Sequence, residues 1–296
     1  MVARPRRSVL YMPGSNPKAL AKARSLPADA VIVDLEDSVA PDAKAAARAL
    51  AVETVRAGGF GGREIVIRVN GAHTPWGAED LAAAIAAAPD AILLPKVDGP
   101  GAIMVAARAL REANAPPTTR LWAMMETPMA ILSAGSIAAT AADPEARLEV
   151  LVMGLNDLAK ETRARLTPGR PAMTNWLAIC VAAARAHGCD IVDGVYNDLN
   201  DPIGFKAECE QGRDMGLDGK TLIHPNQIEI CNATFGPTTA EVESARAIIA
   251  AFSLPENAGR GAIQLNGRMV ELLHEQMARR TLAIADGVAA LANGAG

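Results

Sequence analysis

Charged and amide side chains close or follow five apolar runs of this sequence, at positions where packing alone does not require them. They are Asp34, Glu36 and Asp37; Arg68 and Asn70; Lys96; Glu126; and Asn156 and Asp157. Glu126 and Asp157, from different runs, could supply the oxygen ligands that Mg²⁺ prefers and leave positions open for water and substrate. Arg68 offers a planar fork to a carboxylate or a developing oxyanion, and Lys96 offers a point charge.

Each of these side chains also has an ordinary structural explanation. A single acid at a strand end is more often a helix cap, and this is how we interpret Asp42. Polar side chains on five successive runs are harder to explain by capping, so they favour a functional role for Glu126, Asp157 and Arg68. Lys96 fits either interpretation.

The elements that must position these side chains follow from an alternation of apolar runs and alanine-rich stretches. Strands are expected at residues 8–12, 30–35, 64–69, 91–97, 120–126, 148–154, 189–195 and 220–225. Helices are expected at 17–24, 43–56, 76–88, 101–113, 128–141, 175–187 and 203–215. This pattern predicts a (β/α)8 TIM barrel, in which active-site residues lie on the loops after the carboxyl ends of the strands. A doubly wound open sheet is the alternative, and it is less favoured because the turn MPGSNPK contains no GxGxxG motif.

The alternation stops after residue 235, so we expect a catalytic barrel of residues 1–235 and an extension of residues 236–296. The extension should contain a helix at 239–252, a tight hairpin turn at Asn266-Gly267 and a final helix at 271–291. Because a closed barrel cannot accept a further strand, the extension is expected to pack outside it or to reach a neighbouring subunit.

Composition and charge exclude several classes of partner. A net charge of -4 and a pI of about 5.7 predict no binding to nucleic acid. An anionic ligand therefore requires a local basic patch, and the densest one contains Arg7, Lys18, Lys22 and Arg24. This group is either a solvated helix face or a clamp for phosphates. No apolar run is long enough for a signal peptide or a membrane span, so we expect a cytoplasmic protein.

Other catalytic motifs are missing. There is no GxSxG sequence for a serine hydrolase, and GLDGKT lacks the first glycine of a phosphate loop. The four cysteines form no CxxC pair, which favours buried free thiols in a reducing compartment. The histidines have no spacing typical of metal ligands.

Seven motifs together resemble one known family. RSVLYMPGSNPKAL, ADAVIVDLEDSVAPDAKAAAR, IRVNG, LLPKV, METP, GLNDL and DGKTLIHPNQI are similar to the HpcH/HpaI aldolase superfamily, and specifically to its citrate lyase beta subunit-like branch, which includes malyl-CoA and citramalyl-CoA lyases. The similarity covers residues 7–235 and extends into the tail. It implies a homo-oligomeric, trimeric or hexameric, Mg²⁺-dependent lyase that cleaves or forms a carbon-carbon bond between an acyl-CoA and a small 2-keto acid.

The resemblance also implies roles for individual residues. Glu126 of METP and Asp157 of GLNDL match the metal ligands of the family, and Arg68 of IRVN matches its arginine at the reacting oxygens. Glu36 and Asp37 of DLED match an acidic pair that orients water and side chains beside the metal.

Three basic residues are candidates for binding the substrate. Lys18 and Arg24 resemble positions that face the CoA phosphates in the family. Lys96 could bind the substrate through its point charge.

One position departs from the pattern of the family. The CoA lyases that this chain resembles carry a tail aspartate after a GxMID-like motif, and it reaches the site of a neighbouring subunit. Here NGRMVELLHE places Glu271 there. Its carboxylate lies about one methylene further out, and a misplacement of about 1 Å can lower a rate roughly a hundredfold. The alternative for Glu271 is an acid in the first turn of the final helix, where it would interact with the helix dipole.

Four functions therefore stay open. The first is a lyase for malyl-CoA or citramalyl-CoA. The second is a malyl-CoA thioesterase in which Glu271 activates the hydrolytic water. The third is a citrate lyase subunit that acts on an acyl carrier protein thioester, and the fourth is a non-catalytic protein that binds Mg²⁺ and CoA.

Overall fold

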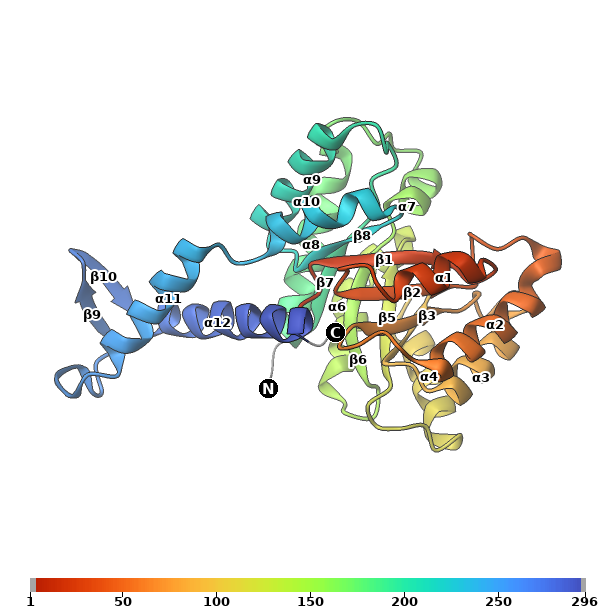
Figure 1. Cartoon of the computed structure of the whole chain (residues 1–296), viewed down its shortest axis with the longest axis horizontal. Helices are drawn as coiled ribbons and strands as arrows, with labels where there is room; N and C mark the ends of the chain where they lie inside the picture. Colours follow the sequence, from red (N-terminus) through yellow and green to blue (C-terminus); the bar gives the residue numbers. More distant parts are fainter. Residues whose placement is uncertain (1–3, 294–296) are drawn as a thin grey trace. The chain divides into compact units, whose positions relative to one another are not determined.

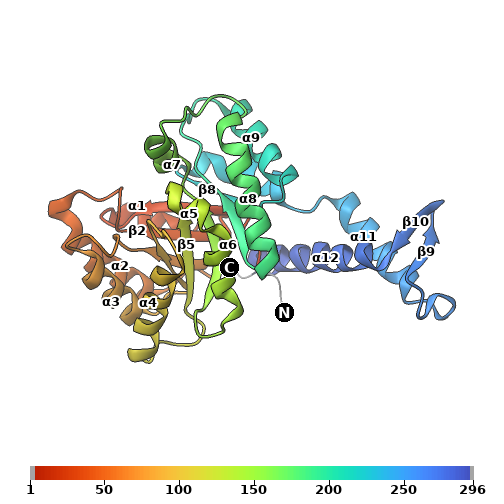
Figure 2. The same ribbon diagram turned by 180° about the vertical axis from the view of Figure 1, so that it is seen from behind.

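The computed structural model describes residues 4–293, and its larger part is a closed barrel of eight parallel strands surrounded by helices (Figures 1 and 2). Neighbours in sequence pair with each other, and β8 pairs with β1 to close the barrel. The strands are β1 Ser8–Pro13, β2 Ala30–Asp34, β3 Glu64–Arg68, β4 Ala91–Leu94, β5 Arg120–Met125, β6 Leu148–Met153, β7 Asp190–Asp193 and β8 Gly219–Leu222. This confirms the predicted (β/α)8 barrel against the open sheet.

Ten α-helices belong to this part of the described chain. They are α1 Pro17–Ala23, α2 Lys44–Ala57, α3 Gly77–Ala87, α4 Pro100–Glu112, α5 Pro128–Leu132, α6 Ala134–Ala139, α7 Leu155–Thr162, α8 Pro171–His187, α9 Pro202–Asp214 and α10 Ile228–Phe235. Short 3-10 helices occur at Pro41–Ala43, Thr140–Ala142 and Pro225–Gln227.

Two differences from the expected helices matter for the site. The helix expected over 128–141 breaks at Ser133, whose φ of -100° and ψ of 6° separate α5 from α6. Helix α7 was not expected from the sequence, and it begins directly after β6, so that Asp157 lies in its first turn.

Buried side chains along the strands alternate between two clusters. One cluster contains strand residues only, among them Ile32, Val66 and Trp122, and it fills the interior of the barrel. The other includes Val31 and Ile67 together with residues of the surrounding helices. This period of two fixes which side chains at the strand ends point inward.

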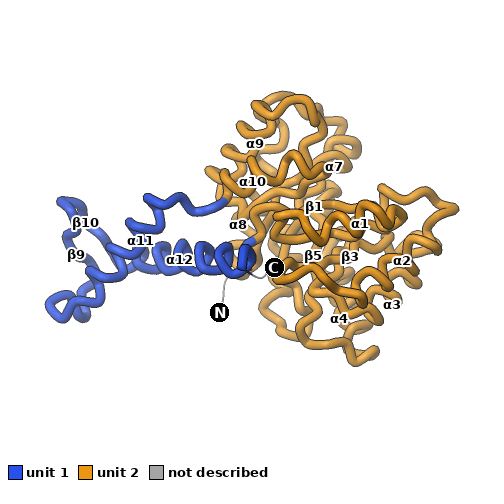
Figure 3. The backbone as a smooth tube through the Cα atoms, in the orientation of Figure 1, with its two compact units in different colours: residues 1–5, 236–296 blue, residues 6–235 orange. Residues whose placement is uncertain are grey.

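The chain divides into two compact units, which Figure 3 shows in different colours. Residues 6–235 form the barrel unit, and residues 236–293 form the smaller unit together with residues 4 and 5. The smaller unit contains α11 Thr239–Phe252, a 3-10 turn at Pro255–Asn257, the antiparallel hairpin of β9 Ala262–Leu265 and β10 Arg268–Glu271, and α12 Leu272–Asn293.

The hairpin and the final helix follow the expected order, with one correction at their junction. Asn266 and Gly267 form the turn with φ of 51° and 77°, as an Asn-Gly turn requires. Glu271 is the last residue of β10 and pairs with Ala262, so its placement in the first turn of the final helix was wrong. The backbone of Glu271 belongs to the ladder of the hairpin, and the Glu271 N–H donates to His274 Nδ1 at 3.0 Å.

Two findings concern the rest of the chain. Among the described helices, none combines the length and the apolar character needed to cross a membrane. The four cysteines are buried free thiols, as expected from their spacing. Burial raises the pKa of Cys180 to about 12 and that of Cys189 to about 11, which makes both thiols poor nucleophiles.

Candidate active site

The carboxyl end of the barrel gathers the polar side chains because they continue the inward-facing rows of the strands. Asp34 lies two residues beyond Ile32, and Arg68 lies two residues beyond Val66. Glu126 continues the row of Trp122 and Met124 on β5 in the same way. All three therefore point into the mouth of the barrel.

Arg68 is held by a buried pair across two neighbouring strands. Asp34 and Arg68 are register partners on β2 and β3. Arg68 Nε donates to Asp34 Oδ1 at 2.6 Å, and Nη2 donates to Asp34 Oδ2 at 2.8 Å. The sequence drew attention to Asp34 but assigned it no role. Its structural role is to accept from Nε and Nη2, which form one edge of the Arg68 guanidinium, with both carboxylate oxygens.

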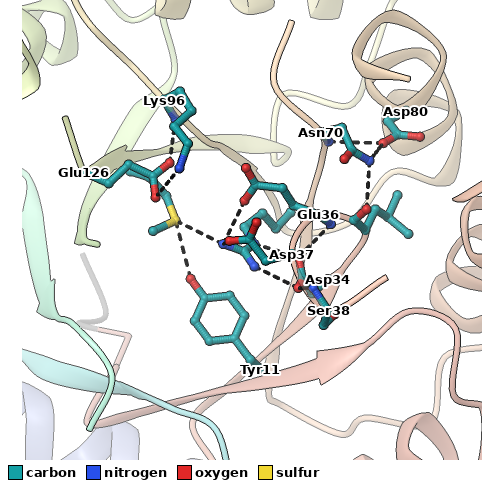
Figure 4. A network of polar contacts seen from close by, with 12 residues as sticks. Tyr11, Asp34, Glu36, Asp37, Ser38, Asn70, Asp80, Lys96 and Glu126 are labelled. Carbon is teal, nitrogen blue, oxygen red and sulfur yellow. Dashed lines mark hydrogen bonds and ion pairs between the residues drawn. The ribbon is translucent and has the colours of Figure 1, made fainter. Parts of the chain in front are cut away.

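The free edge of Arg68 faces the other two acids of the DLED motif, Glu36 and Asp37, which Figure 4 labels beside Asp34. Nη1 lies 2.9 Å from Glu36 Oε2 and 3.6 Å from Asp37 Oδ2. The guanidinium also stacks on the ring of Tyr11, with Cζ 4.8 Å from the ring centroid. Three acids and an aromatic ring therefore fix one cation in the mouth of the barrel.

A second charged cluster lies across the mouth, between β4, β5 and α7. Lys96 Nζ is 2.8 Å from Asp157 Oδ1 and 3.4 Å from Glu126 Oε2. The backbone N–H of Lys96 donates to Glu126 Oε1 at 2.7 Å. Lys96 has a φ of 51°, an unusual value for a lysine, and this turn brings its backbone and its ammonium to the same carboxylates.

Burial and neighbouring charges shift the pKa values of these acids in opposite directions. Burial, together with the charges of Glu126 and Asp37, raises the pKa of Glu36 to about 8 although Arg68 opposes the shift. Burial also raises the pKa of Glu126, against the opposing effect of Lys96. Burial alone would raise the pKa of Asp34 too, but the charge and hydrogen bonds of Arg68 lower it below its ordinary value.

These shifts predict how the stability of the metal-free protein depends on pH. Glu36 has a higher pKa in the folded chain than in the unfolded chain, so the folded state binds its proton more tightly. Stability should therefore fall as the pH rises from about 4.5, the ordinary value, to about 8. Melting temperatures measured across this range should decline for the wild type and decline less for Glu36→Gln. Parallel curves for the two proteins would contradict the shift.

Both charged clusters border one cavity of about 310 Å³. Its lining includes Tyr11, Asp37, Arg68, Glu126 and Asp157. Glu36 and Lys96 are not lining residues, but Glu36 contacts Arg68, and Lys96 contacts Glu126 and Asp157. The lining carries four carboxylates, those of Asp34, Asp37, Glu126 and Asp157, and one cation, Arg68, so an anionic substrate would bind there together with a metal ion that offsets this negative charge.

Comparison with known proteins assigns the chain to a family. The family model described as HpcH/HpaI aldolase/citrate lyase matches residues 7–225. The chain belongs to this family. The resemblance drawn from the seven sequence motifs is therefore confirmed.

Members of the HpcH/HpaI aldolase/citrate lyase family with different names resemble the chain to different degrees. A (3S)-malyl-CoA thioesterase of Cereibacter sphaeroides is 51% identical over 97% of both chains. The citrate lyase subunit beta of Escherichia coli is 33% identical over 90% of this chain and 89% of that one. The structure of CitE from Mycobacterium tuberculosis, in complex with magnesium, acetoacetate and coenzyme A, has a TM-score of 0.74 and 29% identity over 96% of this chain and 98% of that one.

The pair Glu126 and Asp157 fits a divalent cation in this HpcH/HpaI family member. Glu126 Oε2 is buried without a hydrogen-bond partner among the described residues. Lys96 Nζ lies between this oxygen and Asp157 Oδ1, so an ammonium stands where a metal ion would be bound by both carboxylates. Within residues 4–293, no group of three or more His, Cys, Asp and Glu side chains surrounds one metal position. Water and substrate would have to supply the remaining ligands.

Gly154 makes room for this carboxylate, and the sequence analysis did not single it out. A Cβ at Gly154 would lie 2.9 Å from Glu126 Oε2 and would also collide with Glu126 Cβ. Gly154→Ala should therefore displace Glu126 and weaken binding of a divalent cation by about tenfold to a hundredfold. Titration calorimetry with Mg²⁺ would measure the change. Gly135→Ala is the control, because a Cβ there meets no atom within 4 Å.

The cavity lining does not include every candidate residue. Lys18 is exposed in the first turn of α1 and is absent from the lining of the cavity. Arg24 follows the last turn of α1, where its Nε donates to Gly58 O at 2.8 Å and its guanidinium stacks over Phe60 at 5.2 Å. These contacts hold Arg24 beside the loop that precedes β3, at the amino-terminal end of the barrel, away from the site.

Proposed function

We propose that the protein is a Mg²⁺-dependent thioesterase that hydrolyses (3S)-malyl-CoA to malate and free CoA. The observation that supports this most is the 51% identity, over 97% of both chains, to relatives named (3S)-malyl-CoA thioesterase. The charged cavity supports it as well, since malyl-CoA brings a carboxylate and a hydroxyl next to a thioester. Of the functions that the sequence left open, this one ranks above the carbon-carbon lyase.

The proposed metal site consists of Glu126 and Asp157. Mg²⁺ bound there would act as a Lewis acid and a template for oxygens of the substrate. Lys96 Nζ contacts both carboxylates. With an ion bound by Glu126 and Asp157, the Lys96 ammonium would be free to contact the carboxylate of the malyl group.

Arg68 is the proposed electrostatic partner of the thioester oxygen. Hydrolysis adds a water oxygen to the thioester carbon, which places negative charge on the carbonyl oxygen before the carbon-sulfur bond breaks. A preorganised cation at this position stabilises the negative charge on the oxygen more than a cation that must reorient during the reaction. Asp34 and Tyr11 hold the Arg68 guanidinium in one plane beside the cavity.

Glu271 is the proposed base that takes the proton from the attacking water. The proton then passes to the sulfur of the departing CoA, so that the products are a carboxylic acid and a thiol. We place Glu271 in the site of a neighbouring subunit, in a homo-oligomer of three or six copies. Glu36 and Asp37 would orient water beside the metal.

A carbon-carbon lyase remains the second candidate. It is supported by the 33% identity to a citrate lyase subunit beta. The same Arg68 that suits a thioester oxyanion also suits the enolate of acetyl-CoA. A variant of this candidate acts on an acyl carrier protein thioester instead of a CoA thioester.

Product analysis by mass spectrometry separates these reactions. Purified protein is incubated with Mg²⁺ and either (3S)-malyl-CoA or citramalyl-CoA, with and without EDTA. Free CoA and intact malate, lost on addition of EDTA, are the expected products. Acetyl-CoA with glyoxylate or pyruvate would establish the lyase instead. If neither thioester is consumed, the test moves to a malyl or citryl acyl carrier protein.

Mixed oligomers test the proposed origin of Glu271. Glu126→Gln and Glu271→Gln should each lower the rate strongly when present alone. Co-expressed in one oligomer, the two variants should recover activity, because some sites then combine an intact Glu126 with an intact Glu271 from another copy. A mixture no more active than its components would place Glu271 in the site of its own chain or outside the reaction.

A further inference from the structure

A buried lysine outside the cavity holds the segment that carries the acids of the DLED motif. Lys44 is the first residue of α2 and is only 6% exposed. Its Nζ donates to Leu35 O at 2.8 Å, to Glu36 O at 2.7 Å and to Asn70 Oδ1 at 2.8 Å. The ammonium also lies 5.2 Å from the centroid of the Trp76 ring.

These contacts satisfy every proton of the ammonium. A buried ammonium has three donors and is costly to bury unless each finds an acceptor. Two of the three acceptors are consecutive backbone carbonyls, those of Leu35 and Glu36. Any shift of this segment would therefore leave a buried charge partly unbonded.

Asn70 and Asp80 support the lysine from the other side, and Figure 4 shows both next to the acidic segment. Asn70 Nδ2 donates to Leu35 O at 2.7 Å and to Asp80 Oδ2 at 2.5 Å. Asp80 in turn accepts from Arg48 Nε at 2.6 Å. A hydrogen-bonded chain thus runs from Arg48 through Asp80 and Asn70 to Lys44.

The segment is also held on the side of the cavity. The N–H groups of Glu36 and Ser38 donate to Asp34 Oδ1 and Oδ2 at 2.9 and 3.1 Å. Asp34 therefore binds the N–H groups while Lys44 binds the carbonyls. With both sides bonded, the backbone of Glu36 is fixed, and its carboxylate lies 2.9 Å from Arg68 Nη1.

We propose that Lys44 is a positioning residue for the reaction at the barrel mouth. By fixing the carbonyls of Leu35 and Glu36, it sets where Glu36 and Asp37 meet the free edge of Arg68. It makes no contact with the cavity itself, because it is absent from the lining residues. The expected effect on kcat rests on the proposed function. The expected effect on the position of the segment rests on the hydrogen bonds alone.

Lys44→Met tests this role, since methionine keeps an unbranched apolar stem and removes the three donors. We expect kcat on (3S)-malyl-CoA to fall about tenfold to a hundredfold, as for other groups that orient a site, while KM changes less than about twofold. Hydrogen exchange followed by mass spectrometry should show faster exchange in the peptide that covers residues 34–40. If Lys44→Met does not fold, Asn70→Ser is the second variant, because it removes one of the three acceptors. It should lower kcat and speed exchange at residues 34–40, both to a smaller extent.

Arg185→Met is the matched control. Arg185 also bonds two loop carbonyls, those of Cys189 and Gly216, at the amino-terminal end of the barrel. Its loss should lower the melting temperature and leave kcat and the exchange of residues 34–40 unchanged.

The two readouts separate this inference from the proposed function. If the wild type does not hydrolyse the thioester but Lys44→Met still speeds exchange at residues 34–40, the positioning of the segment stands and the proposed reaction is wrong. Unchanged exchange in Lys44→Met would overturn the inference whatever happens to the rate. Faster exchange with an unchanged kcat would also overturn it, because the segment would then not govern catalysis.

Discussion

Glu126→Gln should lower kcat/KM by about a thousandfold or more, because a metal that acts as a Lewis acid contributes several kcal/mol and roughly 4 kcal/mol corresponds to that factor. The variant keeps the shape of the side chain and can still accept the hydrogen bond of the Lys96 N–H. It loses the negative charge that would bind Mg²⁺ together with Asp157. Initial rates across a range of Mg²⁺ concentrations would measure the loss.

The same substitution should not destabilise the metal-free protein. Glu126 Oε2 is buried without a hydrogen-bond partner among the described residues, and burial raises the pKa of this carboxyl. Its ionised form therefore opposes folding at neutral pH, since a raised pKa means that stability is lost as the pH rises through it. Glu126→Gln should melt at the same temperature as the wild type or higher, when both are measured in EDTA.

Glu149→Gln is the control for Glu126→Gln. Glu149 lies near the start of β6 and pairs with Arg6 at 3.1 Å, at the opposite end of the barrel. Loss of the Glu149 charge should change the melting temperature and leave kcat/KM unchanged. A Glu126→Gln enzyme that retained wild-type dependence on Mg²⁺ would exclude Glu126 as a metal ligand.

The barrel itself could be predicted because its sequence signals are local. Apolar runs of strand length, separated by helical stretches, require only the periodicity of side chains. The same periodicity places Arg68 and Glu126 in the mouth, each an even number of residues beyond an interior side chain. Asp34 could have been assigned by the same rule, as the residue two beyond Ile32.

Other features depend on contacts that the sequence does not display. The left-handed backbone of Lys96 brings its N–H and its ammonium to Glu126, and lysine rarely adopts that conformation. The break at Ser133, with φ of -100° and ψ of 6°, and the short helix α7 are not indicated by the periodicity of side chains. The bonds from Lys44 to two carbonyls connect residues eight and nine positions apart, through a loop whose course only the structure shows.

The placement of Arg24 could have been foreseen from helix geometry. Lys18 lies in the first turn of α1, and Arg24 follows its last residue. A helix rises about 1.5 Å per residue, so these two side chains are separated by about 9 Å along the axis. A helix that leaves the mouth after β1 therefore carries Arg24 to the opposite end of the barrel.

Arg68→Lys should lower kcat by about a hundredfold or more, the usual effect of losing one preorganised donor to an oxyanion. Lysine keeps the charge but cannot bind both oxygens of Asp34 at once, and it cannot stack on Tyr11 as a planar group. Steady-state kinetics with (3S)-malyl-CoA would measure the loss. A rate within a few fold of the wild type would mean that only the charge of Arg68 matters.

Removal of the cation separates its structural role from its role in the reaction. Arg68→Met should destabilise the fold by about 3–5 kcal/mol, because Asp34 is left buried without its partner. The double variant Asp34→Leu/Arg68→Met should recover part of that stability, because it removes the unpaired buried charge but also the acceptor of the Glu36 and Ser38 N–H groups. It should recover no activity, because no cation then faces the thioester oxygen. Denaturant unfolding and rates measured on the same preparations would show both effects, and a double variant that regained activity would exclude Arg68 from the reaction.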